Sequence, residues 1–269
     1  MNRPRRCPAG KGGECVVSRW PHCAFAQLAT VAALVVSLTS CESVSGSPQP
    51  PTAPSPYTSP PPPSVLAAAR RYAGGDEFDG PGIDPRLWGV YDSVGSGGAG
   101  LRRPSQITQS NGALTISCTV DGTTGGMMYR VPQLHGLWEA RVKMTAASSN
   151  IHPVLLLWPN DGNWPAGGEI DYMEVTDPAR LSAEGFTHYG ADNSQTYGSV
   201  QADLTRYNVF SVNWSATGIS YYVNNVLWFS DTDQSHIPTQ PMQPAIQLDY
   251  TGGHGIAGTM TVDWIRIYE

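Results

Sequence analysis

Three carboxylic acids lie among apolar residues within the six-residue stretch 169–174. In a β-strand alternate side chains share a face, so Glu169 and Asp171 would point one way and Glu174 the other. One β-bulge after Asp171 would add a residue to the strand and return Glu174 to the face of the other two acids. The stretch therefore predicts a bulged strand that presents three acids on one concave surface.

Carboxyl groups gathered in this way can cleave glycosidic bonds. A retaining mechanism needs two carboxyl groups about 5–5.5 Å apart, one ionised as nucleophile and one protonated as acid. Repulsion between like charges moves their pKa values apart and so supplies the protonated member, while a third carboxyl can hold the nucleophile in place. Trp164, Pro165 and two glycines before the strand are typical of a sugar cleft, because sugars stack on aromatic rings and glycine permits close backbone approach. The alternative is an exposed polar face on an edge strand.

The stretch 169–174, which reads Glu-Ile-Asp-Tyr-Met-Glu, resembles the signature of glycoside hydrolase family 16. It has the bulged form found in the laminarinase, agarase and carrageenase branches, with two residues between the Asp and the second Glu. The resemblance implies that Glu169 is the nucleophile, that Glu174 is the general acid/base and that Asp171 supports Glu169. It extends over about residues 76 to 269, because segments 76–80, 85–88, 136–144 and 259–268 also resemble family motifs.

The composition favours strands and loops over helices, since only 14% of the 269 residues are charged and 29 are glycine and 23 proline. Residues 136–144 alternate between apolar and polar, as in a half-buried strand, and 154–158 form an apolar run typical of a core strand. Short strands separated by Gly, Pro and Asn turns predict an all-β sandwich. The resemblance implies a β-jelly roll of two curved antiparallel sheets with a concave substrate cleft.

Aromatic residues and a histidine near the acids are candidates for sugar contacts. A histidine in a strand is more often structural, and each tryptophan could instead belong to the core, but the resemblance places a histidine in the cleft near the acids. The predicted substrate-binding residues are Trp158, Trp164, His188, Tyr189 and Tyr250.

Two segments depart from the laminarinase pattern. His152 and Leu156 stand where that pattern commonly has aromatic residues, and the segment 248–254 replaces a Gly-Gly-Asn-Trp-like stretch. Both departures affect regions of expected substrate contact, so they leave hydrolysis intact but put the β-1,3-glucan assignment in question.

The resemblance also implies a structural calcium ion on the convex side and no cofactor for catalysis. Its ligands would be backbone oxygens at Glu77 and Gly112 and the side chain of Asp263, because calcium prefers hard oxygen ligands. The alternative is that Asp263 caps a hydrogen-bond network.

The first residues read as a targeting segment. Five basic residues precede the uncharged apolar run 24–38, which ends in a Leu-Thr-Ser-Cys sequence that resembles a bacterial lipobox. We expect a signal peptide over 1–41, a Pro/Ser/Thr-rich linker over 42–74 and the catalytic domain over 75–269. Cys41 would carry the lipid of a secreted protein anchored at the cell surface; the alternative is an ordinary secretory signal with Cys41 incidental. Cys118 would then be the one cysteine of the mature domain and a buried thiol.

Together these features predict a retaining, endo-acting β-glycan hydrolase that acts on β-1,3- or mixed β-glucan as a monomer. A net charge of −6 gives no basic surface for nucleic acid. A transglycosylase would use the same carboxylates and stays open as an alternative. A non-catalytic glycan-binding module on the same fold is the other alternative, and the presence of all three acids argues against it.

Overall fold

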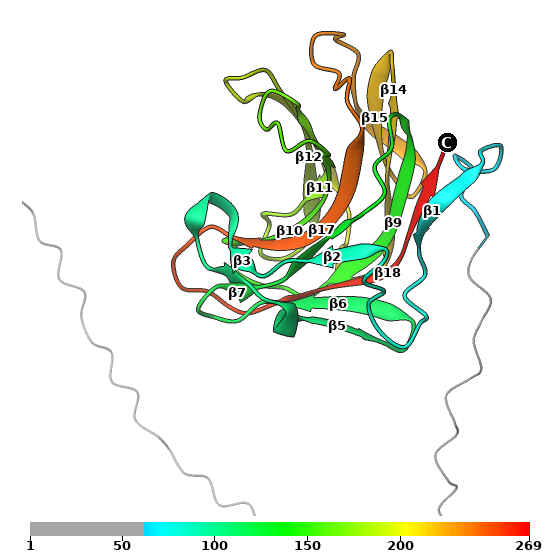
Figure 1. Cartoon of the computed structure of the whole chain (residues 1–269). Helices are drawn as coiled ribbons and strands as arrows, with labels where there is room; N and C mark the ends of the chain where they lie inside the picture. Colours follow the sequence, from blue (N-terminus) through cyan, green and yellow to red (C-terminus); the bar gives the residue numbers. More distant parts are fainter. Residues whose placement is uncertain (1–61) are drawn as a thin grey trace, which may run out of the picture. The chain divides into compact units, whose positions relative to one another are not determined.

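The computed structural model describes residues 62–269 as an all-β fold of two stacked sheets, which confirms the predicted fold class (Figure 1). The outer sheet contains, in spatial order, β16 (Val226–Asp231), β15 (Gly218–Val223), β14 (Asn208–Ser215), β9 (Gly136–Met144), β18 (Thr259–Tyr268), β6 (Ala113–Ser117) and β5 (Ile107–Ser110), with β1 (Tyr72–Asp76) also paired to β18. Its neighbouring strands are antiparallel.

The second sheet carries the three acids and is called the cleft sheet below. Its antiparallel strands are, in spatial order, β13 (Ser194–Gln201), β12 (Ser182–Tyr189), β11 (Glu169–Glu174), β10 (Ile151–Pro159), β17 (Met242–Tyr250), β8 (Gly126–Tyr129) and β2 (Trp88–Val90). A small third sheet contains β3 (Ser93–Val94), β4 (Leu101–Arg102) and β7 (Thr123–Thr124), and two short 3-10 helices, η1 (Ser96–Gly98) and η2 (Pro104–Gln106), lie beside it in the chain.

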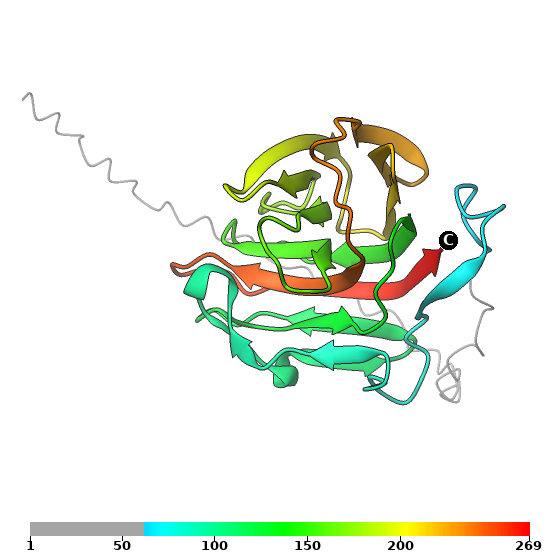
Figure 2. The ribbon, with the colours of Figure 1, turned by 45° about the horizontal axis from the view of Figure 1, so that its top comes forward.

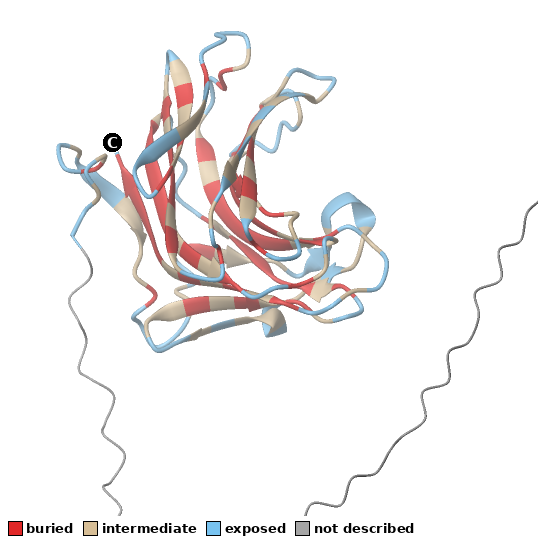
Figure 3. Cartoon of the chain, turned by 180° about the vertical axis from the view of Figure 1, so that it is seen from behind, coloured by how far each residue is buried: buried red, intermediate tan, exposed pale blue. Residues whose placement is uncertain are grey.

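The hydrophobic core fills the space between the two large sheets, as the layers of Figure 2 and the buried residues of Figure 3 show. Alternation along the strands supplies it: Trp138, Ala140 and Val142 of β9 face Ile170 and Tyr172 of β11 within one buried cluster. Because the inner face of the cleft sheet is used for this core, the polar residues of its strands are left on the other face.

One residue of the alternating segment 136–144 departs from expectation. Glu139 stands at a position that the alternation assigns to the polar face, yet it is fully buried. It accepts hydrogen bonds from the hydroxyls of Ser64 (2.6 Å) and Ser211 (3.1 Å), so the chain near Ser64 covers this part of the outer sheet. Burial raises the pKa of Glu139, while these two hydrogen bonds oppose the rise.

The packed part of the chain begins earlier than the boundary expected at residue 75. Ala67 is buried against Leu137 and Tyr268, and β1 starts at Tyr72. The last residues of the predicted linker 42–74 therefore belong to the fold. The predicted signal segment, the lipobox Cys41 and the rest of the linker lie outside the described residues. Cys118 is buried with a free thiol, and within 62–269 no helix is long and apolar enough to cross a membrane.

Candidate active site

The bulge predicted after Asp171 is present in β11. Two consecutive residues of β10, Leu155 and Leu156, pair with Met173 and Asp171, so Tyr172 is the extra residue of the bulge. The register between β11 and β12 also shifts between Asp171 and Glu174. Tyr172 and Met173 both lie fully buried in the core. Glu174 consequently faces the same cleft as Glu169 and Asp171.

A cleft of about 650 Å³ lies over this face of the cleft sheet. Strands β8, β10, β11 and β17 supply its floor, and the segment 91–102 supplies residues of one wall. Its lining residues are Tyr91, Ser93, Ser96, Gly97, Arg102, Met128, Val154, Leu156, Trp158, Trp164, Glu169, Asp171, Glu174, His188, Gln247 and Asp249.

Two stacked tryptophans stand beside Glu169, as the sequence predicted for a cleft wall. The rings of Trp158 and Trp164 lie 5.8 Å apart at an interplanar angle of 15°. The indole N–H of Trp164 donates a 2.7 Å hydrogen bond to Glu169 Oε2, while 41% of Trp164 stays exposed. Gly168, with a φ of 81° that favours glycine, leads the chain from the Trp164 loop into β11. An apolar platform thus lies next to a carboxylate, as sugar binding requires.

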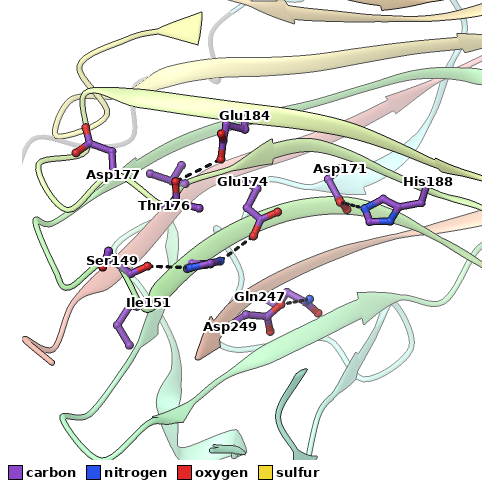
Figure 4. Close-up of polar contacts among 12 residues, drawn as sticks. Ser149, Ile151, Asp171, Glu174, Thr176, Asp177, Glu184, His188, Gln247 and Asp249 are labelled. Atoms are coloured by element: carbon purple, nitrogen blue, oxygen red, sulfur yellow. Dashed lines mark hydrogen bonds and ion pairs between the residues drawn. The ribbon is translucent and has the colours of Figure 1, made fainter. Parts of the chain in front are cut away.

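Asp171 is buried between Glu169 and His188. Its Oδ2 lies 2.9 Å from His188 Nε2 (Figure 4), and the other ring nitrogen of His188 contacts the side-chain amides of Asn193 (2.9 Å) and Gln195 (3.2 Å). Asp171 Oδ1 is buried without a hydrogen-bond partner among the described residues. One ligand atom each of Glu169, Asp171 and His188 lie within 4.8 Å of one another.

Burial and neighbouring carboxylates raise the pKa values of both Glu169 and Asp171. Burial, followed by the Asp171 charge, raises the pKa of Glu169 to about 9, and burial, followed by the Glu174 charge, raises the pKa of Asp171 well above its ordinary value. A proton resting on Asp171 would leave Glu169 ionised. A proton on Asp171 Oδ1 would also satisfy that unpartnered oxygen and donate to Glu169, which keeps the N–H of Trp164 as its second donor.

The same three groups have the types and spacing that could surround a metal ion. Glu169 already accepts from Trp164, and His188 is held by the amides of Asn193 and Gln195. Because these hydrogen bonds and a proton on one of the carboxyls satisfy the polar atoms of the three residues, we assign the cluster to proton transfer and not to metal binding.

Glu174 has a partner that sequence reasoning missed. His152 Nδ1 lies 2.8 Å from Glu174 Oε1, and His152 Nε2 lies 2.8 Å from the carbonyl oxygen of Ser149. In the sequence His152 was notable only for replacing an aromatic residue. The available signal was strand parity: Val154 pairs with Glu174, and His152 stands two residues before Val154, on the same face of β10.

The structure does not bring two predicted sugar contacts into the cleft. Tyr250 is buried in the core, where its hydroxyl donates to the carbonyl of Gly253, so it is wrong as a sugar contact. Tyr189 stacks on His236 with ring centroids 3.7 Å apart and lies outside the cleft lining. The residues that β17 does present to the cleft are Gln247 and Asp249.

Those two residues were missed, although alternation along β17 could have found them. Since Tyr250 faces the core, its neighbour Asp249 and then Gln247 must face the opposite side. Asp249 forms an ion pair with Arg102 of β4, and Gln247 donates a 2.9 Å hydrogen bond to Asp249. Arg102 comes from a distant part of the chain, and its position depends on the tertiary fold.

The residues predicted to bind calcium do not fit that ion. The carboxylate of Asp263 accepts a 2.5 Å hydrogen bond from Arg141, and that of Glu77 forms bonds of 2.7 and 2.9 Å with Arg266. Of the three predicted ligands only Asp263 is charged, and the guanidinium of Arg141 neutralises the charge that would attract a divalent cation. The ion pair instead matches the alternative, in which Asp263 belongs to a hydrogen-bond network; Gly112 lies in the turn between β5 and β6.

Comparison with known proteins gives a family-level match. The sequence model described as glycosyl hydrolases family 16 matches residues 100–266. A glucan endo-1,3-beta-glucosidase A1 of Niallia circulans is 26% identical over 253 residues, which cover 72% of this chain and 37% of that protein. A keratan-sulfate endo-1,4-beta-galactosidase of Sphingobacterium multivorum is 27% identical over 187 residues, which cover 61% of this chain and 44% of that protein. The chain thus spans less than half the length of both relatives.

Solved structures support the fold. The laminarinase catalytic domain from Thermotoga maritima superposes with a TM-score of 0.69 at 20% identity, over 74% of this chain and 98% of that one. The endo-beta-1,3-glucanase from Pyrococcus furiosus gives a TM-score of 0.67 at 19% identity, over 74% and 94% of the two chains.

Proposed function

Because the chain belongs to glycoside hydrolase family 16 and is a glycoside hydrolase, we propose that it cleaves β-glucans internally with retention of configuration. The observation that supports this proposal most directly is the bulge in β11, which brings Glu174 into the same cleft as Glu169. We assign Glu169 as nucleophile, Glu174 as general acid/base and Asp171 as the group that holds Glu169.

The reaction proceeds by double displacement. Glu174 gives its proton to the glycosidic oxygen while Glu169 Oε attacks the anomeric carbon, which breaks the linkage and leaves a covalent glycosyl-enzyme. Glu174 then takes a proton from water as that water attacks the same carbon. Glu169 leaves as a carboxylate, and the sugar keeps its original configuration.

The surroundings of Glu169 support the nucleophile role. Trp164 donates to Oε2 and leaves the other carboxylate oxygen to meet the sugar, and a proton on Asp171 stabilises the ionised form. Burial, followed by the charge of Glu174, raises the pKa of Asp171, which lets this carboxyl hold a proton beside an ionised Glu169, while His188 holds its Oδ2.

For the substrate we propose β-1,3- or mixed-linkage glucan, the class that the name of the Niallia circulans relative states. Keratan sulfate, cut at β-1,4-galactosidic linkages, is the second candidate, because the Sphingobacterium multivorum relative, a keratan-sulfate endo-1,4-beta-galactosidase, matches at nearly the same identity. His152 and Leu156 replace aromatic residues of the laminarinase pattern on the cleft face of β10. This departure from the laminarinase pattern supports a substrate other than β-1,3-glucan. Transfer of the glycosyl group to another sugar uses the same carboxylates, and water is replaced by a sugar hydroxyl.

A polysaccharide panel tests these assignments. The chain is incubated with laminarin, lichenan, agarose, xylan and keratan sulfate, and reducing ends are counted against a Glu169→Gln control. We expect early release of oligosaccharides from laminarin or lichenan, and NMR should show the β-anomer first. Binding without release from any polymer would favour the glycan-binding alternative, and release of the α-anomer first would refute the retaining mechanism.

The N-terminal predictions lead to a separate proposal about location. The chain would be secreted and held at the cell surface by a lipid on Cys41, and the lipobox-like sequence before that cysteine supports it. Mass spectrometry of the N-terminus after expression in a bacterium tests it: a diacylglycerol-modified Cys41 is the expected result, and a free N-terminus elsewhere refutes it.

A further inference from the structure

His152 lies between two oxygen acceptors, and this fixes where its hydrogens are. The carbonyl oxygen of Ser149 can only accept, so the 2.8 Å contact requires a hydrogen on His152 Nε2. The opposite nitrogen, Nδ1, lies 2.8 Å from Glu174 Oε1. When the ring is neutral, Nδ1 can only accept and Glu174 must be the donor; when the ring is charged, Nδ1 donates to the carboxylate. One proton therefore lies between Nδ1 and Oε1.

We propose that His152 is a positioning residue for the acid/base carboxyl, which holds Oε1 of Glu174 and leaves Oε2 to exchange the proton with the glycosidic oxygen. The inference rests on the proposed role of Glu174. It adds a residue that stands where the laminarinase pattern has an aromatic side chain, and a histidine there can both donate to and accept from a carboxyl group.

The charges around the pair favour a protonated His152. Glu174 contacts it from β11, and Asp249 is its register partner on β17, where Arg102 of β4 offsets the charge of Asp249. From β12, Glu184 pairs in register with Glu174, and its Oε2 accepts from the hydroxyl of Thr176 at 3.3 Å. Burial of His152 opposes its charge, but the hydrogen bond and the charge of Glu174 outweigh burial and raise its pKa.

In the acid step Glu174 carries its own proton on Oε2, so a charged His152 is then held by its bonds to Glu174 Oε1 and the Ser149 carbonyl and by the charge of Asp249. The Oε2 proton moves to the leaving sugar oxygen, while the Nδ1 proton stays in its bond to Oε1. The product of that transfer is a carboxylate beside an imidazolium, so the charge that develops on Glu174 is stabilised where it forms. In the second displacement Oε2 regains a proton from water, and the pair returns to its first state.

NMR tests the pairing without any substrate. In ¹⁵N-histidine-labelled protein, the pKa of His152 is read from its ring nitrogens in the wild type and in Glu174→Gln. We expect the pKa of His152 to fall by about one unit or more when the charged partner is removed, because an adjacent opposite charge shifts a pKa by about that much. An unchanged pKa, or a hydrogen on Nδ1 and none on Nε2 in the neutral ring, would overturn the proposal.

Kinetics separate positioning of the acid from a structural role. An aryl β-laminaribioside with a dinitrophenol leaving group needs no protonation, whereas laminarin does. We expect His152→Phe to lose about 10- to 100-fold in kcat/KM on laminarin and much less on the aryl glycoside, in line with the usual size of general acid catalysis. His152→Gln, which keeps a donor for Oε1, should recover part of the loss but show an altered alkaline limb in its pH profile.

The control is His254→Gln, the same change at an exposed histidine outside the cleft lining, which should leave both substrates and the profile unchanged. Equal losses on both substrates, with a pH profile that superimposes on the wild type, would refute the positioning role. If the wild type cleaved neither substrate, the proposed function would fail, and the NMR comparison would still decide whether the pair exists.

Discussion

Trp164→Phe separates the hydrogen bond on the nucleophile from the aromatic surface around it. The change removes the indole N–H that donates to Glu169 Oε2 at 2.7 Å, and it leaves a ring that can still stack on Trp158. A hydrogen bond to a charged group is worth about 1.5–3 kcal/mol. Because Trp164 is 41% exposed, water replaces part of this, and we reduce the figure to about 1–2 kcal/mol.

That energy corresponds to a loss of about 5- to 30-fold in kcat/KM at neutral pH. The bond to Trp164 lowers the pKa of Glu169, so its removal should also raise that pKa and move the acid limb of the pH profile to higher pH. The assay is kcat/KM on laminarin from pH 4 to 9, with Trp158→Phe as the control, since Trp158 stacks in the same pair without touching the acid. Activity of Trp164→Phe within twofold of the wild type, with an unmoved acid limb, would show that this bond does not sustain the nucleophile.

Three further predictions concern the site and its support. Glu169→Gln should abolish turnover, while calorimetry should still detect oligosaccharide binding. Because the pKa of Glu169 is raised in the folded state, the stability that its protonated form gives the wild type is complete below about pH 4.5 and is lost as the pH rises toward 9. The variant should therefore melt a few °C above the wild type at pH 8 and at the same temperature at pH 4. Arg180→Ala should lower the free energy of unfolding by about 3–5 kcal/mol in urea, since this buried guanidinium donates to the carbonyls of Val175, Asp177 and Ile151; a loss below 1 kcal/mol would contradict the role. A chain that begins at residue 75 should melt at least about 5 °C below one that begins at residue 62, because it loses the first three residues of β1 and leaves the carboxyl of Glu139 without Ser64. Equal melting temperatures would restore the boundary at 75.

Strand parity explains why some predictions succeeded. A side chain two residues from a cleft residue also faces the cleft unless a bulge intervenes, and the acids of 169–174 required one such bulge. The family resemblance, and not this rule, placed His188 with the acids, but the rule would have placed Asp249 in the cleft and Tyr250 in the core had it been applied to β17. The error with Tyr250 came from choosing a residue by its aromatic type and ignoring its parity.

Other features depend on segments that the sequence keeps far apart. Ser64 covers Glu139 although 75 residues separate them, and Arg102 meets Asp249 across 147 residues. The pairing of Asp263 with Arg141, which engages the carboxylate predicted to bind calcium, likewise follows from the contact between β18 and β9. No local pattern indicates which arginine reaches which acid.

The sequence by itself determined the all-β class, the acidic strand and its bulge, because alternation and motif spacing are local properties of the backbone. Only the tertiary structure decided which carboxyl lies against which neighbour and that a histidine contacts Glu174. Protonation depends on burial and on charges within a few ångströms, and those distances exist only once β10, β11, β12 and β17 lie side by side.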